Sequence, residues 1–447
     1  MRGRILALTV ATTVVIAATY VRATVGEGQT GSAGGSGRSA MALELAARTD
    51  RRELNRLITA YEAESRTRPT VAGLTFLGQM YLQRGRLTGD VQTYLQAATA
   101  VDRAVALAPR DRPARTLAAG IHYTTHDFAR AEQSARELVA EQPDDQGALA
   151  VLGDSQLELG DYPGASATYA HLAADAPDAA AALVRQARLA FIQGRLADAD
   201  RLAAQAKAQA ETSAFGDAGL AYYSIFQGQL DLDRGLYDDA ARDFEQALRE
   251  SPGYYIATAG LAKAHAAQGR TKDAIELYEA AVAVVPQPDF LAALGDLYTI
   301  AGQDQKARTE YGTVEVIAML AKINQQVYNR QLAMYYADHD LKLDDALRLT
   351  TTELAVRHDV YGYDAQAWAL YKNHRWGEAK VASDRALAQH TPDAKLWYHA
   401  GLIDQALGNL DRARVELRRS LTLSPAFDPL QSSRARAALA DLGVEGP

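Results

Sequence analysis

The chain has 447 residues, a net charge of −8 and no cysteine. The missing cysteines exclude disulfides, thiolate metal sites, a cysteine nucleophile and a lipidated cysteine. The mildly acidic balance, without a long basic stripe, argues against binding of nucleic acid, which needs clustered lysine and arginine. The alanine- and arginine-rich composition is typical of a GC-rich, bacterial coding sequence.

The N-terminus has the features of an export signal. Met1 to Arg4 is a short basic region, and residues 5–21 run without a charge until Arg22. We favour an uncleaved membrane anchor, because 17 apolar residues flanked by arginine are just long enough to span a bilayer. Cleavage after Ala23 by a signal peptidase and an ordinary core helix are the alternatives. If the segment is an anchor, the basic start stays cytoplasmic and the remaining chain lies outside the membrane.

Residues 26–39, GEGQTGSAGGSGRS, form a flexible linker by composition. Residues 40–69 follow with apolar side chains at helical spacing, and we expect them to cap the first repeat of the array described next. A polar helix within 429–447 is the expected cap at the other end. Such caps cover the apolar faces that terminal repeats expose.

Alanine recurs along the chain between these ends at a nearly constant interval. The spacings are 34, 34, 34, 41, 34, 33, 39, 33 and 34 residues, and the alanines are Ala97, Ala131, Ala165, Ala199, Ala240, Ala274, Ala307, Ala346, Ala379 and Ala413. A period near 34 predicts a solenoid of helix pairs.

The residues around each alanine repeat as well. A glycine such as Gly235 ends one helix, acidic residues open the next, and an aromatic such as Phe244 lies four residues after the alanine. A proline such as Pro252 closes the unit. This pattern resembles the tetratricopeptide repeat, and it recurs ten times from about Thr70 to Asp428. The resemblance implies an all-α, right-handed superhelical solenoid of antiparallel helix pairs, A and B.

Three irregularities interrupt the array. Extra residues are expected near 88–94, between the helices of repeat one, and near 210–219, between repeats four and five. A long, weakly punctuated helix is expected over 313–336. We therefore predict these segments: 1–25 signal or anchor, 26–39 linker, 40–69 N-terminal cap, 70–319 repeats one to seven, 320–428 repeats eight to ten, and 429–447 C-terminal cap and tail.

The search for catalytic motifs finds none. The phosphate loop, the Gly-x-Ser-x-Gly elbow, His-Glu-x-x-His and Ser-x-x-Lys do not occur. The histidines and aspartates near 338–340 and 358–359 are the best metal candidates, but solvated turn residues explain them more simply. The sequence therefore predicts no enzyme, no cofactor and no metal site.

The resemblance places the partner-binding surface on the concave face, which the A helices line. No asparagine occupies the ninth repeat position, so the carboxylate clamp of some relatives is unsupported. We expect a partner polypeptide instead, although several of the aromatic residues could pack between repeats. The candidate partner-binding residues are Arg188, Phe191, Tyr222, Gln229, Lys263, Asp296, Tyr335, Trp368, Tyr371, Lys372 and Tyr398.

The predicted function is an exported, membrane-tethered scaffold that binds another protein. The alternatives are a cleaved, soluble extracytoplasmic protein that binds peptide or glycan, and a cytoplasmic regulator or metal-binding protein. The oligomeric state is not predicted.

Overall fold

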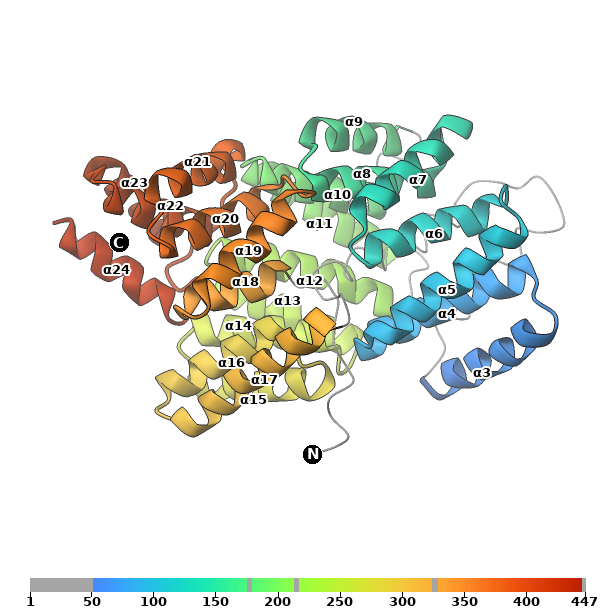
Figure 1. The fold of residues 1–447 in the computed structure, drawn as a ribbon, viewed down its shortest axis with the longest axis horizontal. Coiled ribbons are helices and arrows are strands. Elements are labelled where there is room, and N and C mark those ends of the chain that lie inside the picture. The colour runs from blue at the N-terminus through green and yellow to red at the C-terminus, as the bar shows by residue number, and fades with distance from the viewer. Residues whose placement is uncertain (1–50, 175–178, 213–216, 324–328, 444–447) are drawn as a thin grey trace. The chain divides into compact units, whose positions relative to one another are not determined.

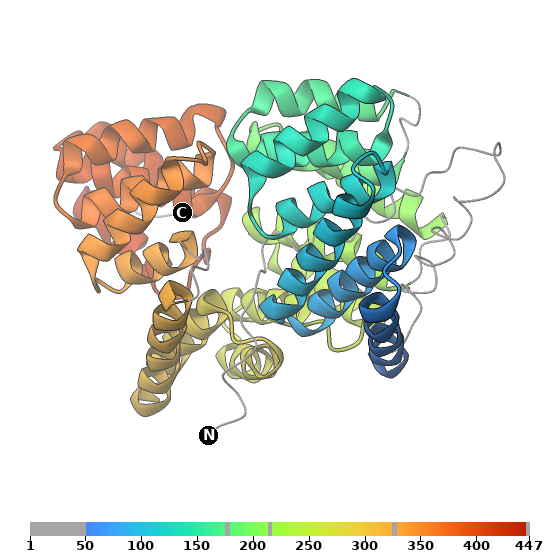
Figure 2. The same ribbon diagram turned by 45° about the vertical axis from the view of Figure 1, so that its right-hand side comes forward.

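A computed structural model describes residues 51–174, 179–212, 217–323 and 329–443. Every regular element in these ranges is a helix, and most lie as antiparallel neighbours (Figures 1 and 2). The expected anchor and linker lie outside the described residues. The packing is densest between the two helices of one repeat, as for α4 with α5, α14 with α15 and α22 with α23.

The chain divides into two compact units. Unit 1 comprises residues 1–186 and 205–223, and unit 2 comprises 187–204 and 224–447. The expected division at 319/320 falls inside unit 2. It lies close to residues 324–328, which are outside the described ranges, so this domain boundary stays a prediction.

Unit 1 begins with the N-terminal helix and continues through the first three repeats. Its helices are α3 (Arg51–Thr67), α4 (Val71–Thr88), α5 (Val91–Leu107), α6 (Arg112–Thr124), α7 (Phe128–Glu141), α8 (Gln146–Leu159) and α9 (Tyr162–Leu172). The unit boundary then crosses α10 (Ala180–Ile192), α11 (Leu196–Thr212) and α12 (Asp217–Asp233).

Unit 2 continues with the remaining repeats and the C-terminal helix. They are α13 (Tyr237–Glu250), α14 (Tyr255–Ala267), α15 (Thr271–Val284), α16 (Pro288–Ile300), α17 (Asp304–Ile323), α18 (Asn329–Asp338), α19 (Leu343–Leu354), α20 (Val360–Lys372), α21 (Trp376–Ala386), α22 (Ala394–Ala406), α23 (Leu410–Leu423) and α24 (Gln431–Asp441).

The ten recurring alanines all lie in the core, at 3% exposure or less. Small residues of the A helices face the aromatic residues of the B helices. A Cβ added at Gly153 would lie 2.4 Å from the ring of Tyr169, and one at Gly295 would lie equally close to Tyr311. Larger residues at these positions would force the helices apart. The spacing thus reflects close packing of helix pairs.

Helix ends follow the signals in the sequence. In unit 1, Asp111, Asp127, Asp145 and Asp161 each precede a helix and accept a backbone N–H of its first turn. Gly235 has a left-handed backbone with φ +73°, and a Cβ there would also meet the Leu423 carbonyl at 3.1 Å. Glycine therefore suits this turn for both conformation and space.

The extra residues of the irregular repeats lengthen helices. In repeat one, α4 and α5 have 18 and 17 residues, and only Gly89 and Asp90 separate them. In the region of the 41-residue interval, α11 and α12 have 17 residues each. A long helix was expected over 313–336. The 20-residue helix α17 covers the first part of that range and ends at Ile323.

The two end helices bury apolar residues, as capping helices do. Leu54 and Ile58 of α3 are at most 1% exposed, and Ala435 and Leu439 of α24 are fully buried. Among the described residues, no helix is long and apolar enough to cross a membrane.

Candidate binding surface

The candidate partner-binding residues differ widely in exposure. Six of them are at most 8% exposed: Phe191, Tyr222, Asp296, Tyr335, Trp368 and Tyr398. Gln229 and Lys263 are exposed, and Arg188, Tyr371 and Lys372 are partly buried. Burial favours packing between repeats for the first six, and the role of all eleven in binding stays a prediction.

Trp368 shows how such packing works in repeat nine. Its indole Nε1 donates to Asp338 Oδ1 at 2.8 Å, and its ring stacks on Tyr371 and His399 with centroids 5.0 and 4.2 Å away. The Lys372 ammonium lies 4.9 Å from the ring centroid. The cluster joins α18, α20 and α22, so it holds three repeats together.

Two aspartates in the middle of A helices form buried networks with B-helix tyrosines. In unit 1, Asp154 accepts from Tyr169 Oη at 2.8 Å and from Arg185 Nε and Nη2, each at 2.9 Å. The carboxylate and the guanidinium are both buried, so this pair joins repeats three and four inside the protein.

Asp296 plays the same part in repeat seven. It accepts from Tyr311 Oη at 2.7 Å and contacts His339 Nε2 at 2.8 Å. Burial alone would lower the pKa of His339, but the bond to Asp296 and its charge outweigh burial and raise it. The interaction joins repeat seven to repeat eight.

Lys263 stands at the corresponding position of repeat six. Asp154 and Tyr169 are 15 residues apart, as are Asp296 and Tyr311, and as are Lys263 and Tyr278. Tyr278 is 6% exposed. A lysine therefore stands where an aspartate accepts from the other two tyrosines.

The positive charge of Lys263 acts on three carboxyl groups. They belong to Asp233 at the end of α12, Asp289 in the first turn of α16 and Asp393 before α22. Burial raises the pKa of all three, and the charge of Lys263 opposes this rise without cancelling it. We call Asp233, Lys263, Tyr278, Asp289 and Asp393 the acidic cluster.

The carboxyls of the acidic cluster are hard to ionise. Burial and the charge of Asp393 raise the pKa of Asp233 to about 7. Loss of hydration beside the neighbouring protein raises the pKa of Asp289 to about 6. Surrounding protein therefore removes part of their hydration without supplying enough positive charge.

A second group of charges nearby is balanced. The Lys395 ammonium lies 3.5 Å from Asp338 Oδ2 and 3.2 Å from Asp428 Oδ2. Burial opposes the charge of Lys395, but the two carboxylates raise its pKa above the ordinary value. Gln431 of α24 also donates to Asp338, so this group attaches the C-terminal helix.

Loops of the last repeats contact the ends of α10 and α12 and the start of α13. Thr391 Oγ1 donates to the Ile192 carbonyl at 2.6 Å, and Ser424 Oγ donates to the Leu232 carbonyl at 3.2 Å. The Ala426 N–H donates to Tyr237 Oη at 2.7 Å. These contacts join residues almost 200 positions apart. Sequence reasoning missed them, as well as Asp289, Asp393 and Tyr278, because the repeat period gives no sign of long-range contacts.

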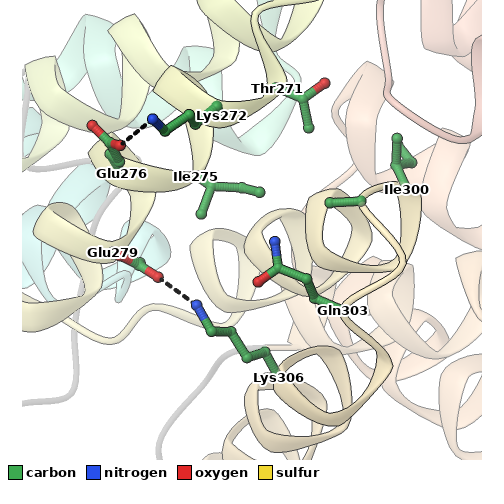
Figure 3. Close-up of a pocket in the computed structure, with 9 residues that line it drawn as sticks. Thr271, Lys272, Ile275, Glu276, Glu279, Ile300, Gln303 and Lys306 are labelled. Atoms are coloured by element: carbon green, nitrogen blue, oxygen red, sulfur yellow. Dashed lines mark hydrogen bonds and ion pairs between the residues drawn. The ribbon is translucent and has the colours of Figure 1, made fainter.

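A separate cleft of about 460 Å³ lies between α15 and the turn that joins α16 to α17 (Figure 3). Ile275 and Ile300 line it among charged side chains. Lys306 pairs with Glu279 at 3.5 Å, and Lys272 lies 4.0 Å from Glu276. The charged side chains of this cleft thus pair with one another.

The metal candidates near 338–340 and 358–359 have other partners. His339 contacts Asp296, Asp340 pairs with Lys372, and Asp359 pairs with Arg330 and begins α20. In the described ranges, no group of three or more metal-ligating side chains could hold a metal ion.

The helix pairs and the buried small residues define an all-α solenoid repeat protein. Models of the tetratricopeptide repeat match residues 90–146, 125–187, 227–289, 261–318 and 394–427. The chain belongs to the tetratricopeptide repeat family. This agrees with the resemblance drawn from the alanines, and repeats of this kind form scaffolds for protein interaction. No curated protein matches the chain.

Several solved structures share this kind of fold. A human IFIT1 dimer with PPP-AAAA is 14% identical with a TM-score of 0.45, covering 84% of this chain and 96% of that one. PilW, a widely conserved type IV pilus biogenesis factor, is 18% identical with a TM-score of 0.40, covering 45% and 91%. A repeat protein from Parabacteroides merdae is 15% identical with a TM-score of 0.33, covering 59% and 98%.

Proposed function

We propose that this protein is a non-enzymatic scaffold that binds a partner polypeptide on the A-helix side of unit 2. The observation that carries the proposal is the contrast in exposure between A-helix residues. Gln229 and Lys263 are exposed on α12 and α14, whereas the corresponding residues of repeats seven to nine are buried. Polar side chains that the packing leaves uncovered are available to a partner.

Photocrosslinking tests the surface. A p-benzoyl-phenylalanine at Gln229 should crosslink a partner polypeptide in intact cells, and the same residue at Val415 should not. Val415 is a suitable control because it is 62% exposed on α23, a B helix. A crosslink from position 415 alone would contradict the proposed surface.

We further propose that the protein is exported and remains tethered through residues 5–21, with the array outside the membrane. The basic start, the apolar run and the glycine-rich linker support this arrangement. Protease treatment of intact spheroplasts should digest the array while the protein stays in the membrane fraction. A mature N-terminus at Thr24 would instead favour the cleaved, soluble alternative, and protection from protease would contradict export.

A further inference from the structure

Two hydrogen-bonded contacts close unit 2 on itself. In an ordinary solenoid each repeat contacts only its neighbours. In unit 2, by contrast, the ends of the A helices of repeats four and five meet the loops that follow the B helices of repeats nine and ten. We call the residues of the two contacts, 192–194 with 389–391 and 232–237 with 423–426, the clasp.

The first contact of the clasp joins the turn after α10 to the loop before α22. Thr391 is fully buried, and its Oγ1 donates to the Ile192 carbonyl at 2.6 Å. Gly194 lies in the same turn with φ +72°, and a Cβ there would be 2.8 Å from the His390 carbonyl oxygen. The two backbones therefore approach more closely than a side chain at position 194 would allow.

The second contact repeats this arrangement one repeat further on. Ser424 Oγ donates to the Leu232 carbonyl at 3.2 Å and lies 3.0 Å from Tyr237 Oη. Tyr237 Oη also accepts from the Ala426 N–H at 2.7 Å. A Cβ at Gly235, which has φ +73°, would lie 3.1 Å from a carbonyl oxygen of the facing loop. Both contacts thus combine a left-handed glycine with a buried hydroxyl group.

Other turn glycines of unit 2 have the same backbone conformation but no facing loop. Gly269, Gly302 and Gly408 have φ values between +69° and +80°, and a Cβ at any of them would meet no atom within 4 Å. The close approach at Gly194 and Gly235 is therefore a property of the clasp and not of the repeat.

Opening the clasp would break contacts between distant repeats only. The packing inside each repeat is local: Phe244 faces Gly228 within repeat five, and Leu417 faces Gly401 within repeat ten. Unit 2 can therefore open at the clasp while each repeat stays folded.

The clasp also lies beside the proposed binding surface. Leu232, which accepts from the facing loop, lies three residues after Gln229 on α12, which is less than one turn of helix. The loops of repeats nine and ten therefore attach to the same end of α12 that carries an exposed residue of this surface.

We propose that the clasp is a conformational switch that opens to admit a partner polypeptide to the A-helix side of unit 2. In the open form, unit 2 is an ordinary solenoid with contacts between neighbouring repeats. The partner binds the open fraction of molecules, so its apparent affinity depends on the stability of the clasp. This inference rests on the proposed function for the binding surface, whereas the closure can be measured without a partner.

Distances between two spin labels on the purified full chain test the closure. The chain has no cysteine, so the labels attach only to cysteines introduced at Ala197 and Val381, which are exposed on α11 and α21. Pulsed electron resonance should give one narrow distance distribution for the closed protein. Gly194→Ala with Gly235→Ala should shift it to longer distances and broaden it, because the added methyl groups meet the facing loops.

A matched control has the same left-handed turns without a facing loop. Gly269→Ala with Gly408→Ala brings the same backbone strain and should leave the distance distribution unchanged. Equal broadening in both double variants would overturn the proposal, because strain in the turns would then explain the effect.

A second variant removes hydrogen bonds of the clasp without adding bulk. Tyr237→Phe with Thr391→Val deletes two hydroxyl groups and should shift the distribution in the same direction. Tyr363→Phe is the control, because it removes a hydroxyl group that accepts from Arg385 within repeat nine. An unchanged distribution in the double variant would contradict the role of the clasp in closure.

Photocrosslinking connects the closure to binding. With p-benzoyl-phenylalanine at Gln229 in intact cells, both clasp variants should raise the yield of the partner crosslink about twofold or more, since a larger open fraction captures more partner. An unchanged or lower yield in a variant that the spin labels show to be open would overturn the proposed switch and leave the binding surface intact. If only position 415 crosslinks, the proposed surface fails, and the spin labels still decide whether the clasp opens.

Discussion

Repeats three and six differ around two corresponding positions, which hold Asp154 and Tyr169 in repeat three and Lys263 and Tyr278 in repeat six. In repeat three, Asp154 meets Tyr169 and the guanidinium of Arg185, and the whole group is buried. In repeat six, an exposed lysine, Lys263, replaces the aspartate, and Tyr278 has no aspartate at the corresponding position. One architecture can therefore use its inner side chains to join repeats or leave them available to a ligand.

Asp154→Asn should give the largest effect, because it leaves the buried Arg185 guanidinium without its carboxylate. Breaking a buried ion pair from one side costs about 3–5 kcal/mol. The thermal unfolding midpoint should fall sharply. Asp198→Asn removes exposed ion pairs with Arg195 and Arg201 and should shift the midpoint little. Equal shifts would show that the Asp154 network is not a structural link.

Glu416→Gln should act in the opposite direction. Glu416 is buried in α23, and burial, together with the nearby Asp404, raises its pKa to about 7. The folded state therefore favours the protonated form, and stability falls as the pH rises from about 4.5 to about 7.

Glutamine mimics the protonated group, so the variant should be more stable at pH 8 by on the order of 1–3 kcal/mol. Urea unfolding at pH 5 and pH 8 measures the difference. Glu245→Gln, at an exposed site, is the control and should change little at either pH.

The Asp233→Asn variant tests the ionisation of one carboxyl group of the acidic cluster. The pKa of Asp233 is raised to about 7, so its ionisation weakens the fold as the pH rises from about 4 to about 7. The variant should gain about 1 kcal/mol at pH 8 and little at pH 4, since the partly exposed carboxyl keeps some hydration. A loss of stability at pH 8 would mean that Asp233 has a cation that compensates it.

His339→Asn should give the smallest effect, visible mainly as pH dependence. Burial lowers the pKa of His339, but Asp296 raises it further, so protonation stabilises the fold. That contribution is complete below about pH 6.5 and disappears as the pH rises through the raised pKa. Melts from pH 6 to pH 9 should show a flatter profile for the variant, with a difference of about 1 kcal/mol or less. Parallel profiles would exclude this role for His339.

The regular part of the fold could be read from the sequence because it depends on neighbouring residues. A glycine or alanine faces an aromatic residue within one 34-residue unit, so both residues of the contact lie in the same repeat. The lengths of the irregular helices were harder to predict from the sequence. The residues near 88–94 were expected between helices, but α4 continues to Thr88 and α5 begins at Val91.

The exposed candidates Gln229 and Lys263 could also be found from register alone. The buried aromatic residues could not be distinguished from them, because a tyrosine or tryptophan on an A helix fits both an interface and a packing role. Trp368 is 1% exposed because Tyr371 and His399 stack on its ring and Asp338 of α18 accepts from its Nε1.

By itself the sequence determined the repeat, its period, its ends and the residues that join helix A to helix B, since those contacts are local and recur ten times. The tertiary structure decided which inner side chains remain accessible. The hydrogen bond of Thr391 to Ile192 and that of Ser424 to Leu232 depend on the accumulated turn of several repeats. Small rotations add up along the array, so these two contacts have no local signal in the sequence.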